Sequence, residues 1–332
     1  MTIQGLIGAA ALAAYWCSLL QGADNTSWKA SMLRVAQLQR QRDYQGALET
    51  LEIAEKQAAV LGADSLEMAV SLNNLGILCQ ELGRIADAER YFLRFLSLVK
   101  RLPDQTLLEL RGAGNLAALY LGANQLGAAR RLDLPAIAQR LEQVAPGSSD
   151  LASAYVNVGL LEAAEGDPAE ASAAFRRALL IWEKTDGHAA VQAAAFSDLG
   201  VVLMRLHRNA DGLEALNRAV ALAENELGTQ DPALIPLLEN AGGGQALTGN
   251  PASAVAHLDH ALDIAKKSFG MDHIRTARVM AVYAETLRQL HRKGEAKALE
   301  KRARAILAKQ GREQSLGGGV VDIRDATAFV GR

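Results

Sequence analysis

A small residue recurs at a fixed spacing along the chain, and this spacing constrains the fold more than any other feature. The stretch SLNNLGILCQELGRIADAERYF (71–92) reads as a helix, a turn at Gly83 and a second helix, with Ala88 just after the turn. The same position recurs at steps of 41 or 42 residues: Ala47, Ala88, Ala129, Ala171, Gly212, Ala254 and Ala296. A period this regular over seven units predicts an all-α solenoid of stacked helix pairs.

A second small or slender residue lies twelve positions before each of these: Val35, Gly76, Ala117, Gly159, Gly200, Gly242 and Ala284. Four residues after the small residue that follows each turn, a large apolar residue usually appears: Leu51, Phe92, Phe175, Leu216 and Leu258. Small groups allow two helices to approach closely, and the large residue faces the core of its pair. Asp133 and Glu300 replace this apolar residue in repeats 3 and 7, and Pro135 predicts a broken second helix in repeat 3.

Composition agrees with a helical array and excludes one broad class of function. Half of the 332 residues are apolar but only 5% are aromatic, which favours helices over sheets. With 35 basic and 37 acidic residues the net charge is -2, so the chain as a whole lacks the electrostatic signature of a nucleic-acid-binding protein. The basic stretch 288–312 is better explained as the solvated face of the last helices than as an anion-binding patch.

The N-terminal segment and the cysteines bear on cellular location. Residues 2–23 carry no charged side chain, and we expect 1–23 to be a cleaved signal peptide of an exported protein, periplasmic or secreted. The alternatives are an uncleaved anchor in the membrane and a cytoplasmic protein. Cys17 and Cys79 predict no disulfide framework, and Cys79 falls where a small buried residue is expected.

The repeats resemble those of the tetratricopeptide repeat (TPR) family, in the variant of about 42 residues found in kinesin light chains. The resemblance rests on LNNLGILCQELGRIADAERYFLRFL, YVNVGLLEAAEGDPAEASAAFRRAL and FSDLGVVLMRLHRNADGLEALNRAV. It implies a right-handed α-α superhelix of seven helix-turn-helix repeats over residues 28–310. Residues 311–332 are expected to form a non-helical tail, which could occupy the groove or recruit a partner.

The resemblance also implies that the first helix of each repeat lines a concave groove for an extended peptide. Two residues before the small position of the first helix, a polar residue recurs in repeats 2 to 6: Asn74, Asn115, Asn157, Asp198 and Asn240. Asparagine is a mediocre helix former, so this row indicates a role other than helicity. Amides can bind a peptide backbone, as in the similar asparagine ladder of the O-linked N-acetylglucosamine transferase, but they can equally bond to neighbouring helices.

Other family functions and enzymatic chemistry find less support. Arg111, one turn before Asn115, is a further candidate for peptide binding in the groove. The two residues have the spacing of the clamp that holds chaperone C-termini, but the adjacent repeats lack the partners that this clamp requires. His257 and His260 could share a metal, yet no third ligand follows from the sequence. We therefore expect a non-catalytic protein-interaction scaffold without a cofactor or metal. A structural component of the cell envelope, and a metal-dependent enzyme framed by the array, are the alternatives.

Overall fold

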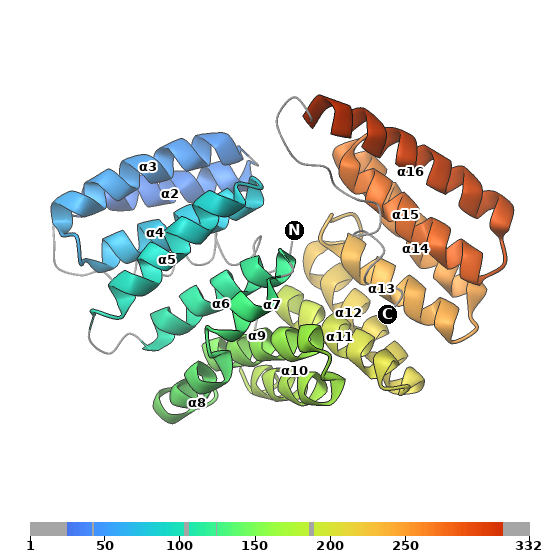
Figure 1. Cartoon of the computed structure of the whole chain (residues 1–332), viewed down its shortest axis with the longest axis horizontal. Helices are drawn as coiled ribbons and strands as arrows, with labels where there is room; N and C mark the ends of the chain where they lie inside the picture. The colour runs from blue at the N-terminus through green and yellow to red at the C-terminus, as the bar shows by residue number, and fades with distance from the viewer. Residues whose placement is uncertain (1–24, 42, 103–105, 124, 186–188, 315–332) are drawn as a thin grey trace. The chain divides into compact units, whose positions relative to one another are not determined.

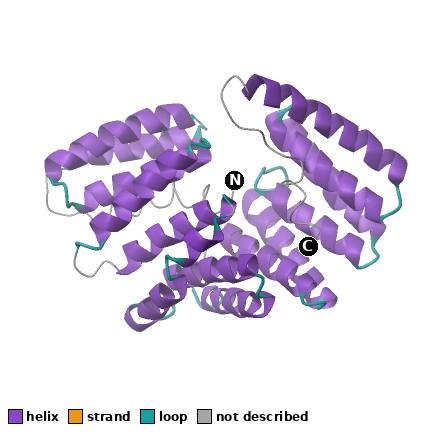
Figure 2. Ribbon diagram, in the orientation of Figure 1, coloured by secondary structure: helices purple, strands orange, loops and turns teal. Residues whose placement is uncertain are grey.

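A computed structural model of the chain describes residues 25–41, 43–102, 106–123, 125–185 and 189–314. The regular secondary structure of these residues is helical throughout (Figure 2). The chain divides into two compact units, residues 1–187 and 188–332, each of which is described by itself. The predicted leader or anchor at 1–23 lies outside the described residues. Within the described ranges, no helix combines the length and apolar character needed to cross a membrane.

The first unit contains four helix pairs, which Figure 1 shows in blue to green. Its helices are α2 (Thr26–Arg40), α3 (Tyr44–Leu61), α4 (Leu66–Glu81), α5 (Ile85–Val99), α6 (Thr106–Gly122), α7 (Leu126–Arg130), α8 (Leu134–Val144), α9 (Ser149–Glu165) and α10 (Pro168–Trp182). The first helices of the pairs are α2, α4, α6 and α9, and α7 with α8 together form the second helix of repeat 3. Contacts connect α4 to α6 and α6 to α9, so neighbouring first helices lie against each other.

The second unit contains three helix pairs, in yellow to red in Figure 1. Its helices are α11 (Ala189–Arg205), α12 (Asn209–Leu227), α13 (Leu234–Leu247), α14 (Pro251–Phe269), α15 (Ile274–Gln289) and α16 (Lys293–Gln314). Contacts connect α11 to α13 and α13 to α15, which are the first helices of successive repeats. The predicted fold class, a series of helix-turn-helix repeats, is confirmed.

The glycine at the small position of four first helices is explained by the large side chain of the partner helix. A Cβ added to Gly76 would lie 2.5 Å from the ring of Phe92, which is fully buried. The same conflict occurs between Gly159 and Phe175 at 2.8 Å. Gly200 with Leu216 and Gly242 with Leu258 repeat it at 2.6 and 2.8 Å. Separations under 3 Å exclude a side chain, so these glycines fix how closely the paired helices approach.

The turns within the pairs use the left-handed backbone region. Gly83, Gly166 and Gly249 have φ values of 73°, 91° and 78°, which glycine adopts without steric cost. His207 and His291 take the same place in repeats 5 and 7 with φ of 58° and 60°. Asp167 caps α10, because its carboxylate accepts the backbone N–H of Glu170 at 3.1 Å.

Repeat 3 is interrupted where the sequence predicts a break. Its second helix stops after α7 and resumes at α8, with Asp133 between them at φ 51° and Pro135 in the first turn of α8. Proline suits the first turn of a helix but disrupts its interior, so the chain restarts the helix here. Leu134 is 1% exposed, and it supplies an apolar core residue directly after Asp133.

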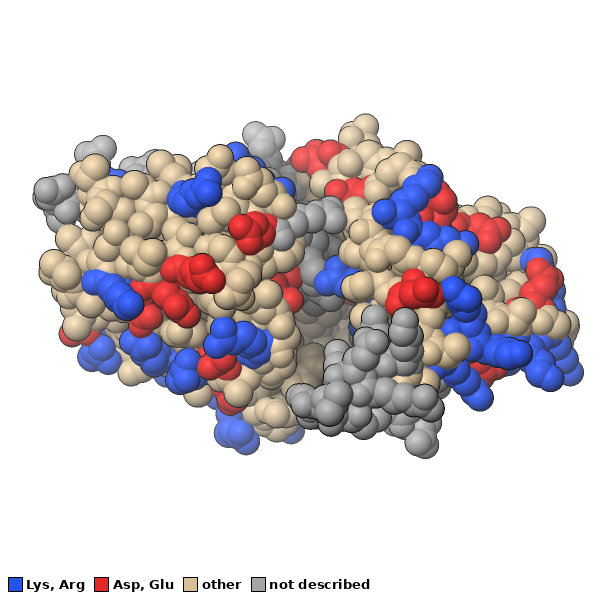
Figure 3. Space-filling model, turned by 90° about the horizontal axis from the view of Figure 1, so that it is seen from above, with Lys and Arg blue, Asp and Glu red and all other residues tan. Residues whose placement is uncertain are grey.

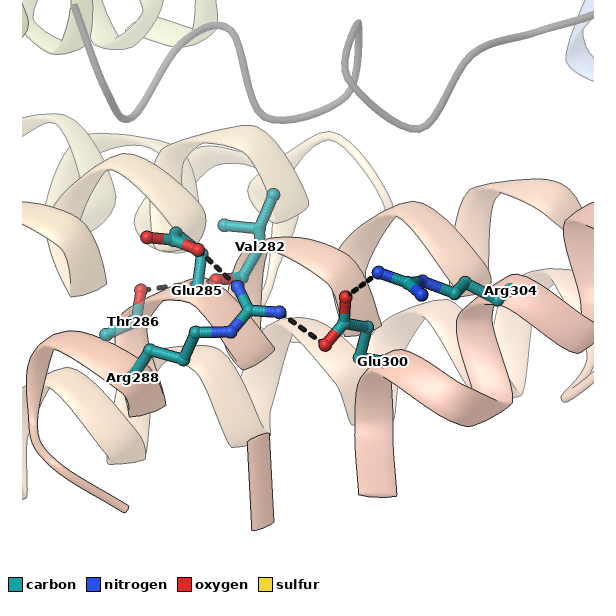
Figure 4. Close-up of polar contacts among 6 residues, drawn as sticks. All are labelled: Val282, Glu285, Thr286, Arg288, Glu300 and Arg304. Atoms are coloured by element: carbon teal, nitrogen blue, oxygen red, sulfur yellow. Dashed lines mark hydrogen bonds and ion pairs between the residues drawn. The ribbon is translucent and has the colours of Figure 1, made fainter. Parts of the chain in front are cut away.

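The last repeat carries paired charges where most other repeats carry an apolar side chain. Glu300 on α16 replaces the core residue and forms ion pairs with Arg288 and Arg304, while Arg288 also reaches Glu285 (Figure 4). In the space-filling view, basic and acidic side chains alternate over this end of the chain, at the right of Figure 3. The arrangement agrees with a solvated terminal repeat.

The C-terminal boundary differs from the prediction. Helix α16 continues to Gln314, four residues into the segment expected to be non-helical. A single glycine at 311 lowers helix stability by only about 1 kcal/mol, and the residues that follow it, Arg312 to Gln314, are good helix formers. The rest of the expected tail, 315–332, lies outside the described residues.

Candidate functional site

The predicted polar row in the first unit lies between successive first helices. Asn115 on α6 donates its amide N–H to Oδ1 of Asn73 on α4 at 2.9 Å. Asn157 on α9 lies over Gly114 of α6, where an added Cβ would be 2.2 Å from its Nδ2. Asn74 is 3% exposed and donates to the carbonyl of Val70 in its own helix at 2.8 Å. From repeat 3 onward, each amide therefore reaches back to the residue that precedes the row position in the repeat before it.

Arg111 stands one turn before Asn115 and pairs with a carboxylate of the next repeat. Its Nε and Nη2 donate to Oδ1 of Asp150, in the first turn of α9, at 2.8 and 2.6 Å. Both side chains are about one-quarter exposed, so the ion pair is sheltered from solvent. Arg111 therefore forms an ion pair with α9, the first helix of the next repeat.

The second unit repeats the same geometry with different residues. Asn240 on α13 donates its amide N–H to the hydroxyl of Ser197 on α11 at 2.9 Å. Ser197 directly precedes Asp198, the row residue of its repeat, as Asn73 precedes Asn74. Asn240 and Asn115 both remain half-buried. Within the described residues, neither amide oxygen accepts a hydrogen bond, so each side chain uses its donor and keeps its acceptor available.

Two half-buried carboxyls flank the Ser197–Asn240 bond. Asp198 follows Ser197 on α11, and Glu239 precedes Asn240 on α13. Burial raises the pKa of Asp198 from 3.8 to about 7. Burial also raises the pKa of Glu239 to about 7, although the guanidinium of Arg278 on α15 opposes the shift. In the described part of the chain, neither carboxyl forms an ion pair.

Gly243 leaves open space one turn beyond these groups. It follows Glu239 by four residues and Asn240 by three, so it lies on the same face of α13. Gly243 is itself buried, and a Cβ built on it would meet no atom of the described residues within 4 Å, unlike one on the neighbouring Gly242 or Gly244. Packing therefore explains Gly242 and Gly244 but not Gly243.

Among the site residues that were not predicted from the sequence are Asn73, Ser197 and Glu239. Each stands one residue before a row position, and this fixed offset is the signal that could have identified them. This offset becomes informative only with the structure, which shows that side chains of the polar row contact these residues in the preceding repeat.

The histidines offer no metal centre in the described ranges. His257 and His260 bond through ring nitrogens to the backbone oxygens of Ser253 and Thr229, each at 2.8 Å. Among the residues that the structure describes, no group of three or more histidine, cysteine, aspartate or glutamate side chains could hold a metal ion.

A polar hollow of about 650 Å³ lies at the turns of repeats 3 and 4, away from the row. Its lining includes Arg130, Glu162, Glu165 and Asp167. Burial raises the pKa of Glu162, and the neighbouring acids add to the shift. Arg130 lies 3.6 Å from Glu165, so the hollow already contains its own counter-ion.

Comparison with known families gives matches over most of the array. Models described as tetratricopeptide repeat match residues 29–101, 191–267 and 235–309, and a second model of the same description matches 151–187. Among curated protein sequences, none matches this chain.

Solved structures share the fold at low sequence identity. A Podosopora anserina protein with kinesin-light-chain TPR-like repeats is 20% identical and has a TM-score of 0.51, with 61% of this chain and 97% of that chain covered. Aspartyl phosphate phosphatase F from Bacillus subtilis is 14% identical with a TM-score of 0.63, covering 89% and 72%. The Rap conjugation gene regulator of plasmid pLS20, in complex with the Phr* peptide, is 12% identical with a TM-score of 0.61, covering 91% and 80%. At these identities the similarity concerns the fold.

Proposed function

Because the chain belongs to the tetratricopeptide repeat family, we propose that it is a non-catalytic scaffold that binds an extended peptide or protein segment along its first helices. The partner is a protein rather than a nucleic acid, in keeping with the near-neutral net charge of -2. We also propose that the protein is exported from the cytoplasm, on the strength of the uncharged N-terminal segment 2–23.

The observation that carries this proposal is that amides of the polar row use their N–H groups within the protein while their oxygens remain available. Asn115 and Asn240 each donate to the preceding repeat, at 2.9 Å in both cases, which holds the side chain in one orientation. The oxygen of such an amide can accept a backbone N–H from an extended ligand. Because the side chain is already held in place, binding costs little further side-chain entropy. The structural and the ligand-binding interpretations of the row are therefore compatible.

The structural neighbours are consistent with peptide binding. The pLS20 regulator carries a bound Phr* peptide in its structure. The neighbours also include a phosphatase, but the described residues here offer no cluster for metal-dependent catalysis. A structural role in the cell envelope remains the second candidate, and self-association of the chain would favour it.

Photo-crosslinking in the native host tests the proposal. A benzophenone amino acid is placed at Leu160 or Val201, which follow Asn157 and Asp198 by three residues on the first helices. The matched controls carry it at Leu180 on α10 or Ala221 on α12, both exposed on second helices.

We expect crosslinked partners at the first-helix positions and none at the controls. Equal or stronger crosslinking at Leu180 and Ala221 would contradict the groove. Products that consist of two copies of this chain would instead support the structural role.

A further inference from the structure

We propose that the chain's own C-terminal segment, residues 315–332, docks in extended form across the first helices of the second unit. Its Asp322 pairs with Arg278 on α15, and its Arg324 pairs with Glu239 on α13. This inference rests on the proposed function, because the segment covers the surface on which the partner binds and so regulates access to it. We call Arg278, Glu239 and Asn240 the docking face.

The docking face presents two opposite charges on neighbouring first helices. Arg278 is exposed on α15, one turn before Val282, which stands at the row position of repeat 7. Glu239 is half-buried on α13, next to Asn240 of the row. The guanidinium of Arg278 opposes the rise in the pKa of Glu239, so the two groups lie within electrostatic range of each other. On α15, Arg288 pairs with Glu285, but in the described part of the chain neither Arg278 nor Glu239 forms an ion pair. A segment that supplies an acid and then a base would neutralise both charges.

The segment carries its charges in the matching order. Asp322 is the first charged residue after Gln314, and Arg324 follows two positions later. Alternate residues of an extended segment point to the same side, so both can face the helices. Two positions correspond to about 7 Å, and the length of an arginine side chain covers the rest of the 8–10 Å between neighbouring helix axes. A segment that runs from α15 to α13 therefore meets Arg278 with its acid and Glu239 with its base.

The length of the segment suits this path. Helix α16 passes the start of α15 where Arg302 pairs with Asp272 at 2.7 Å, and it ends about 18 Å further along. The path back to Arg278, near the start of α15, is then about 27 Å. Residues 315–322 span at most about 28 Å when extended, so the acid at their end can reach the guanidinium. Three glycines within this stretch allow the chain to reverse direction.

Small residues follow on the side of the segment that faces the helices. After Arg324, the next alternate positions are Ala326 and Ala328. Their short side chains let the backbone approach the helices closely, at the place where the amide oxygen of Asn240 is available. The same oxygen is proposed to accept a backbone N–H of the partner. The segment and the partner therefore compete for it.

The test uses the purified full chain with a benzophenone amino acid at Pro236, one turn before Asn240 on α13. Irradiation is followed by tryptic digestion and mass spectrometry. We expect α13 to be joined to residues 313–324 or 325–332, the two tryptic peptides of the segment. The matched control carries the probe at Ala221, which is exposed on α12, and should give no such product.

Isotope mixing shows which chain supplies the segment. In an equal mixture of nitrogen-15-labelled and unlabelled chains, we expect both joined peptides to carry the same isotope. Products of mixed isotope would mean that the segment docks on a second copy, and they would overturn the inference. No joined product from the unsubstituted segment would also overturn it.

Charge reversal tests the pairing itself. Arg278→Glu and Asp322→Arg should each reduce the crosslink by at least about fivefold, and the two changes together should restore most of it. The matched control Lys297→Glu reverses a charge at an exposed position of α16 and should leave the yield unchanged. Equal loss in this control, or a double variant without recovery, would contradict the proposed pairing.

The outcomes separate this inference from the proposed function. Partner crosslinks at Leu160 and Val201 in the host, without a crosslink to the segment in the purified chain, would refute the docking and leave the proposed function intact. A crosslink to the segment without partner crosslinks at those positions would support the docking and count against the proposed function.

Discussion

Asp198 and Glu239 are single residues whose burial works against folding once they are ionised. The pKa of each carboxyl is raised to about 7, so the folded chain holds these protons more tightly than the unfolded chain does. The contribution of these two carboxyls to the free energy of unfolding is then greatest below about pH 4, falls as pH rises towards 7, and is constant above that. The ionised acids are destabilising at neutral pH, which is unusual for residues with a purely structural role.

At pH 8, Asp198→Asn should raise the free energy of unfolding by about 1 kcal/mol or more, because the amide needs no proton to be neutral. The corresponding rise in Tm is about 2–4 °C per kcal/mol, and it should vanish near pH 4. Thermal unfolding followed by circular dichroism between pH 4 and 8 measures this. A lower Tm at both extremes would show that Asp198 stabilises the fold instead.

Glycines in the first helices serve different purposes at the scale of the element. Gly76→Ala should destabilise the protein by about 1–3 kcal/mol, since its Cβ would lie 2.5 Å from the Phe92 ring. Gly243→Ala should stabilise it by about 0.5–1 kcal/mol, because alanine is the better helix former and the space is open. Urea unfolding of both variants is the measurement, and a loss of stability in Gly243→Ala would mean that its space is needed for packing.

The interrupted helix of repeat 3 depends on Leu134. Leu134→Ala should cost about 2–5 kcal/mol, because this side chain is 1% exposed. Leu180→Ala on α10 is the control, and at 54% exposure it should change stability by less than about 0.5 kcal/mol. Similar urea midpoints for the two variants would mean that the segment around Asp133 adds little to the core.

At the scale of the whole molecule, each repeat of an array contacts only its neighbouring repeats. A destabilising change therefore affects mainly the repeats next to it. Cys79 on α4 is 0% exposed, so its thiol reacts only when repeat 2 opens, and burial raises its pKa. In a Cys17→Ser background, Phe92→Leu should speed labelling of Cys79 by about tenfold, which corresponds to about 1.4 kcal/mol. Leu258→Ala in the second unit should leave the rate unchanged, and equal acceleration by both changes would indicate global unfolding.

The sequence predicts the elements well because close packing repeats with the period. Gly76 and Phe92 can be paired from their spacing alone, and Asp133 with Pro135 predicts the break in repeat 3. The end of α16 was misjudged because one glycine at 311 is too weak a signal to stop a helix.

Predicting the candidate site from sequence is harder because its residues belong to different repeats. The period identifies Asn240 and Asp198, but it does not say which side chain of the preceding helix each one faces. The bond from Asn240 to Ser197, and with it the importance of Glu239, requires the register between α11 and α13. Arg111 likewise matched a clamp by spacing, whereas its partner Asp150 lies in the following repeat.

The reach of Asn115 to Asn73, across 42 positions of the chain, has a consequence for how such a protein can change in length. Removal of residues 115–156 would join Gly114 to Asn157 and bring Asn157 to the place that Asn115 occupies, above Asn73. The interrupted repeat would be lost while the polar row kept its register. Unequal recombination between repeats could therefore shorten the array by a whole unit at this place, with Asn73 ready to accept the amide N–H of the residue brought above it.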